Sequence, residues 1–234
     1  MIEYNIVTIC NKLYSPFLIK FVESAFKNLK NIPNVYIVDA GIEKDTKTYL
    51  IENYKQLNFV NLKNSNEYQS ESTHDDGWKK TTYSKAKYLK DISISTKLPT
   101  FLIDNDSFFY EDFLDIIDFD SDIVACERTN KFKCTHIASF FGIINSKISD
   151  SFVEKWMHNL DKVKNNRGTF QTGSESPALS MTLSETNHRV QHIMDKIISC
   201  YDINNINNCR IYHSKSGKIA NTIEKRLARY EARK

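Results

Sequence analysis

Short apolar runs alternate with segments of helical periodicity in the first part of the chain, and this alternation limits the fold more than any other feature. Runs typical of buried strands lie at residues 4–10, 34–41 and 57–63. Between them, apolar residues recur at helical spacing in 17–29 and 47–54. Strands and helices that alternate at this spacing predict an α/β fold with a largely parallel sheet.

The same pattern continues through the rest of the chain. Further helices are predicted at 78–92, at 149–163 and from Pro177 onward, and further strands at 98–103, 120–127 and 137–147. Ser15 and Pro16 stand where the cap and the first position of the first helix are expected. Because no repeat or linker interrupts the chain, we predict one domain over 1–218, followed by a basic helix over 219–234.

Composition excludes several classes of protein. A net charge of +3 over 234 residues is too small to predict nucleic-acid binding. No apolar run reaches the roughly 18 residues that a membrane helix needs, and the N-terminus does not resemble a signal peptide. The five cysteines are odd in number and none forms a C-x-x-C pair, which favours reduced thiols and a cytoplasmic location.

Two carboxylates follow the apolar run Phe101-Leu102-Ile103 directly. Side chains alternate along an extended chain, so Asp104 and Asp106 are expected to point to the same side. Ligands of open α/β sheets bind beyond the carboxyl ends of the strands, and paired carboxylates suit a hard cation such as Mg²⁺ or Mn²⁺. The alternative is a strand that simply ends in a polar turn.

At this point the sequence resembles a known family. The stretches "YSKAKYLKDI" and "LPTFLIDNDSFF" are similar to the central signature of GT-A-fold glycosyltransferases, most closely the glycogenin/galactosyltransferase-like branch. The resemblance implies a Rossmann-like, mostly parallel sheet flanked by helices. It also implies a nucleotide-diphosphate sugar held through a D-x-D motif, here Asp104 and Asp106, and Mn²⁺ or Mg²⁺.

Carried over position by position, the resemblance implies roles for residues at strand ends. Thr8, Cys10 and Asn11, which end the first strand, would lie near the base and ribose. Asp39, after the second strand, would hydrogen-bond the base. A turn-forming role for this aspartate before Gly41 is the alternative.

The resemblance implies further donor contacts near the carboxylate pair. Lys85 would reach the diphosphate or a D-x-D carboxylate, with a solvated helix lysine as the alternative. Asn105 and Asp104 belong to the same donor-binding set. Gly142, in "FFGIINSK", would let the sugar approach the backbone closely.

Glu175 lies in a polar loop before the helix that begins at Pro177. The resemblance implies that this carboxylate faces the acceptor, as a general base if the reaction inverts the anomeric carbon and as an orienting group if it does not. The alternative is a structural carboxylate favoured by the helix dipole.

His213 follows an apolar pair near the end of the chain. The family carries H-x-x-G-x-x-K at this place, where the histidine is the third metal ligand and the lysine contacts the diphosphate. Here Gly217 and Lys218 follow at a different spacing, so Lys215 is a second candidate for the phosphate contact. An exposed turn histidine is the alternative.

Together, these features predict a metal-dependent glycosyltransferase of hexosyltransferase type. Its donor would be a UDP- or GDP-sugar and its acceptor a glycan or another hydroxyl compound. A nucleotidyltransferase is one alternative, although "CNKLYSPF" lacks the Gly-rich loop expected there. A non-catalytic carbohydrate-binding protein on a degenerate GT-A fold is the other.

The basic tail carries one apolar stripe, made of Ile219, Ile223, Leu227 and Tyr230. Lysines and arginines surround this stripe, which predicts a weak peripheral contact with an anionic membrane. The alternative is that the stripe packs back on the domain beside His213.

Overall fold

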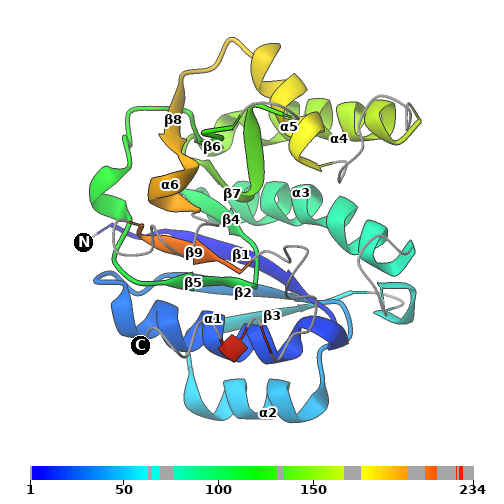
Figure 1. Cartoon of the computed structure of the whole chain (residues 1–234), viewed down its shortest axis with the longest axis vertical. Helices are drawn as coiled ribbons and strands as arrows, with labels where there is room; N and C mark the ends of the chain where they lie inside the picture. Colours follow the sequence, from blue (N-terminus) through cyan, green and yellow to red (C-terminus); the bar gives the residue numbers. More distant parts are fainter. Residues whose placement is uncertain are drawn as a thin grey trace.

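The computed structural model describes residues 2–62, 65–68, 76–130, 134–165, 175–199, 209–214, 225 and 227–228. A seven-stranded sheet runs through its centre, with helices packed on both faces (Figure 1). The strand order is β3-β2-β1-β4-β7-β6-β8. Within the described chain β7 alone runs antiparallel to its neighbours, so the predicted mostly parallel α/β fold is confirmed.

The strands of this sheet are β1 (Asn5–Cys10), β2 (Asn34–Asp39), β3 (Leu57–Asn61), β4 (Thr100–Ile103), β6 (Ile123–Glu127), β7 (His136–Ile143) and β8 (Val190–Met194). A separate two-stranded sheet pairs β5 (Ser107–Phe109) with β9 (Ile211–His213). This small sheet lies beyond the end of β4 and carries part of the site.

The helices are α1 (Ser15–Asn28), α2 (Lys44–Asn53), α3 (Asp76–Thr96), α4 (Ser149–Asn165), α5 (Glu175–Ser184) and α6 (Asp195–Ile198). Short 3₁₀ turns span Lys12–Tyr14, Ser65–Tyr68, Leu114–Ile116 and Ser146–Ile148. Apolar residues of α1 and α2 pack on one face of the sheet, and those of α3, α4 and α5 pack on the other.

Burial on both faces explains why polar and apolar residues do not alternate along β1. Ile6 and Cys10 belong to the core under α1, whereas Val7 and Ile9 belong to the core under α3 and α4. A parallel strand covered by helices on both sides has no polar face to present, so its sequence shows no alternation.

The structure confirms the predicted helices up to residue 184 and the predicted sheet strands within a few residues, and it corrects one cap. Ser15 does not cap α1; it is the first residue of that helix, and Tyr14 stands at the cap position. Asn11 instead caps the preceding 3₁₀ turn by accepting a hydrogen bond from the Tyr14 N–H. β5, β8, β9 and α6 were not predicted.

Most of the basic tail lies outside the described residues. Leu227, one member of its apolar stripe, packs against a cluster formed by Phe17, Phe108, Cys209 and Tyr212. Packing on the domain is what the alternative to membrane contact predicts for this residue. No helix of the described chain is long and apolar enough to cross a membrane.

Gly142 lies inside the sheet, between Phe101 on β4 and Val124 on β6. A Cβ at this position would come within 2.6 Å of Phe101 Cδ1 and 3.5 Å of Val124 Cβ. Phe101 is fully buried, so its ring has little room to move. Core packing therefore explains why position 142 needs a residue without a Cβ. A contact between Gly142 and a sugar stays a prediction.

We expect Gly142→Ala to lower the free energy of unfolding by about 1–3 kcal/mol, because the added methyl group overpacks the core against Phe101. Urea denaturation measures the change. In a Phe101→Leu background the loss should be smaller, since leucine leaves space for the methyl group. Fully additive losses in the double mutant would contradict this explanation.

Candidate metal centre

The segment after β4 forms a tight turn. The Ser107 N–H donates to the Asp104 carbonyl at 3.0 Å, and β5 begins directly at Ser107. The chain over 104–106 is therefore not extended. The predicted alternation of side chains does not explain why the two carboxylates point to the same side. The turn nevertheless aims Asp104 and Asp106 at a common point, as their shared contact with His213 shows.

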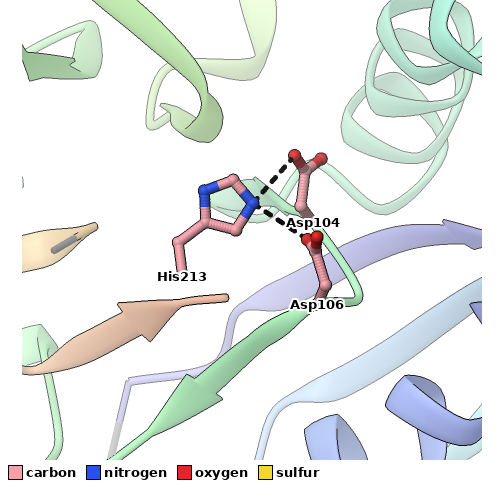
Figure 2. A group of neighbouring side chains, drawn as sticks. All are labelled: Asp104, Asp106 and His213. Carbon is pink, nitrogen blue, oxygen red and sulfur yellow. Dashed lines mark hydrogen bonds and ion pairs between the residues drawn. The ribbon is translucent and has the colours of Figure 1, made fainter. Parts of the chain in front are cut away.

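The pairing of β5 with β9 brings His213 to this turn. Ser107 is the register partner of His213, and the Ser214 N–H donates to the Asp106 carbonyl at 2.8 Å. His213 Nε2 lies 2.9 Å from Asp106 Oδ1 and 3.6 Å from Asp104 Oδ2 (Figure 2). A histidine 107 residues away in sequence thus completes the predicted triad.

This triad can hold a metal ion. Asp104, Asp106 and His213 each offer a ligand atom, and these atoms lie within 4.8 Å of one another. Neighbouring ligands of an octahedral ion with bonds near 2.1 Å are separated by about 3 Å, which is close to the spacing seen here. Two carboxylates and an imidazole form a donor set that divalent metals accept.

Lys85 of α3 joins the metal triad to Glu175. Its Nζ lies 2.7 Å from Asp104 Oδ1 and 3.3 Å from Glu175 Oε1. Burial alone would lower the pKa of Lys85, but attraction to Asp104 and Glu175 outweighs burial and raises it above the ordinary value. Lys85 is therefore a fixed positive charge, and the solvated-lysine alternative does not describe it.

Among the described residues of this small region, acidic side chains outnumber basic ones. Three carboxylates, from Asp104, Asp106 and Glu175, face one ammonium group, from Lys85. By formal charge, these four described side chains carry two negative charges in excess. A divalent cation at the triad would cancel them, which agrees with the donor set.

Glu175 is the first residue of α5, and its side chain is largely enclosed. A carboxylate at a helix N-terminus is stabilised by the helix dipole, as the structural alternative expects. The contact with Lys85 adds a link to the metal triad that this alternative does not include. The sequence contains no local signal for this ion pair, because α3 and α5 are far apart along the chain.

Asp39 has the turn-forming role that was the alternative to base binding. Its Oδ1 accepts the N–H groups of Gly41 and Ile42, and its Oδ2 accepts Lys47 Nζ at 2.7 Å. Burial would raise the pKa of Asp39, but the Lys47 ammonium and the two backbone donors hold it below the usual value. Sequence reasoning missed Lys47, which also reaches Asn61. A contact between Asp39 and a base stays a prediction.

The other predicted donor contacts surround the end of β1. Thr8, Cys10 and Asn11 are buried, and the Asn11 amide donates to the Tyr68 carbonyl. Burial raises the pKa of the Cys10 thiol, which donates a hydrogen bond to the Asn11 carbonyl. These residues end the strand next to β4, and their contacts with a nucleotide stay predictions. Lys215, Gly217 and Lys218 lie outside the described residues.

Comparison with known proteins supports the fold assignment. No protein-family model matches the sequence, and no curated protein matches it. A crystal structure of the galactosyltransferase LgtC in complex with donor and acceptor sugar analogs is similar to this chain, with a TM-score of 0.65 at 12% identity, covering 97% of this chain and 95% of that chain. An active-site mutant of LgtC gives a TM-score of 0.61 at 13% identity over 97% and 95% of the two chains. The chain therefore has the GT-A fold of LgtC.

We expect Mn²⁺ to raise the melting temperature of metal-free protein by a few degrees, because the ion binds the folded triad and not the unfolded chain. Asp106→Ala should remove this shift. Asp161→Asn, an exposed carboxylate on α4, is the matched control and should retain it. An equal shift in all three proteins would show that the ion binds elsewhere.

Lys85→Gln should tighten binding of Mn²⁺ alone by about tenfold, because the ammonium group competes with the ion for Asp104. Isothermal titration calorimetry at low salt measures the affinity. Lys87→Gln removes an exposed charge from the same helix and should leave the affinity unchanged. Weaker binding in the Lys85 variant would mean that this lysine organises the ligands and does not compete with the ion.

Proposed function

We propose that this protein is a metal-dependent glycosyltransferase that moves a hexose from a nucleotide-diphosphate sugar to a hydroxyl group of a glycan or similar acceptor. The observation that carries the proposal is the Asp104, Asp106 and His213 triad, with Lys85 and Glu175 beside it, beyond the carboxyl end of β4. The shared fold adds support, since LgtC was crystallised with donor and acceptor sugar analogs.

Departure of the nucleoside diphosphate is the electrostatic task of this reaction. Asp104, Asp106 and His213 would hold Mn²⁺ or Mg²⁺, which supplies Lewis-acid stabilisation of the diphosphate when bound. Lys85 presents a permanent positive charge next to the same place. Inclusion of an imidazole favours Mn²⁺ over Mg²⁺, because Mg²⁺ prefers oxygen ligands.

Glu175 serves the acceptor side in this proposal. It lies 3.3 Å from Lys85 Nζ, so a donor diphosphate bound beside Lys85 would lie near it. A carboxylate there orients the acceptor hydroxyl by accepting its hydrogen bond. The ion pair with the Lys85 ammonium group holds that carboxylate in place.

A donor panel tests the activity without a known acceptor. Glycosyltransferases hydrolyse donors slowly, so release of UDP or GDP from UDP-glucose, UDP-galactose or GDP-mannose is measured with Mn²⁺ and with EDTA. We expect metal-dependent release from one donor class and none from Asp106→Ala. Release of pyrophosphate from a nucleoside triphosphate and a sugar phosphate would favour a nucleotidyltransferase. Glycan binding with no nucleotide chemistry would favour the carbohydrate-binding alternative.

Glu175→Gln should lower donor turnover about a hundredfold and leave the affinity for nucleoside diphosphate nearly unchanged, because glutamine keeps the shape and loses the charge that acts on the acceptor. Glu52→Gln, an exposed position on α2, serves as the control and should match the unmodified protein. Comparable losses of turnover and nucleotide affinity would assign Glu175 to the donor site.

A further inference from the structure

A bulge interrupts β7 beside the metal centre. On its partner β6, Ala125 pairs with Phe141 but the next residue, Cys126, pairs with Ile137. The register therefore skips residues 138–140. Bulges of this kind free backbone groups from the ladder and are common next to active sites.

One backbone group freed by the bulge holds one part of the site, and the pairing of β7 with β4 holds another. The Ala138 N–H donates to Ser176 Oγ at 3.1 Å, and the Ser139 carbonyl accepts the Asp104 N–H at 3.1 Å. Ala138 is buried, so its N–H needs a partner within the protein. Two adjacent residues of one bulge thus fix the backbone next to Glu175 and the backbone of Asp104.

A second serine of α5 makes a similar bond farther from the site. Ser180 Oγ accepts the N–H of His136 at 3.0 Å and donates to the Ser176 carbonyl at 2.8 Å. Both serines therefore join α5 to β7, one turn of helix apart. Ser176 differs because it is adjacent in sequence to Glu175, whose carboxylate contacts Lys85.

We infer that Ser176 is a positioning residue: its hydroxyl anchors the first turn of α5 on the β7 bulge and so holds the Glu175 carboxylate beside Lys85 and Asp104. This inference rests on the proposed function for its kinetic consequence. Asp104 and Glu175 are thus connected in two ways. Lys85 bridges their side chains, and residues 138 and 139 of β7 hold the backbone next to each. Loss of the Ser176 hydroxyl would release the first turn of α5, and with it Glu175, while leaving the metal triad intact.

Three variants test the inference in the full chain: Ser176→Ala, Ser176→Thr and Ser180→Ala. We expect Ser176→Ala to lower kcat for donor turnover about tenfold, because the variant misplaces Glu175. KM for the donor should stay within twofold, because the donor contacts are unchanged. Ser176→Thr keeps a hydroxyl and should restore most of the rate. Ser180→Ala should lower the melting temperature about as much as Ser176→Ala does, and it should keep kcat within twofold of the unmodified protein.

Equal losses of kcat in Ser176→Ala and Ser180→Ala would overturn the inference, as would a threonine variant no faster than alanine. If the unmodified protein turns over no donor, the proposed function fails and a structural readout decides the inference. In a crystal structure of Ser176→Ala, Glu175 Oε1 should lie clearly farther from Lys85 Nζ than the present 3.3 Å. An unchanged distance would overturn the positioning role independently of activity.

Discussion

The ammonium group of Lys85 is the interaction on which the rest of the site depends. Carboxylates brought close together inside a protein raise one another's energy unless a cation lies between them. Lys85 contacts two of the three carboxylates, those of Asp104 and Glu175, while Asp106 contacts His213. Helix α3 carries this charge from one face of the sheet to the strand ends, which links the packing of the core to the chemistry of the site.

Local features of the sequence were sufficient for much of the fold. Each sheet strand of the first half, such as 4–10, is an apolar run next to a helical pattern, and the local sequence of such a run is enough to predict a strand. The Asp104 and Asp106 pair was identified for the same reason, because it follows a buried strand directly. The geometry beyond that pair was not local: a turn sets the direction of both carboxylates, although extended alternation was expected.

Contacts between distant segments explain what sequence reasoning missed. β5 and β9 have three residues each, too few to give a periodic signal, yet their pairing places His213. That histidine was predicted as a ligand from the resemblance and from its place after an apolar pair. In the same way, the pairing of Asp39 with Lys47 and the bulge of β7 depend on neighbours in space. A fold alone does not define a reaction, so the functional argument belongs to these contacts.

The separation of the metal ligands along the chain has a consequence for biosynthesis. Asp104 and Asp106 leave the ribosome about half a chain earlier than His213, whose contact with Asp106 spans 107 residues. Chains are made from the N-terminus, and the large sheet can begin to assemble while β9 is still absent. A nascent chain shorter than 213 residues therefore holds at most two of the three candidate ligands, so the complete triad forms only after synthesis has passed residue 213.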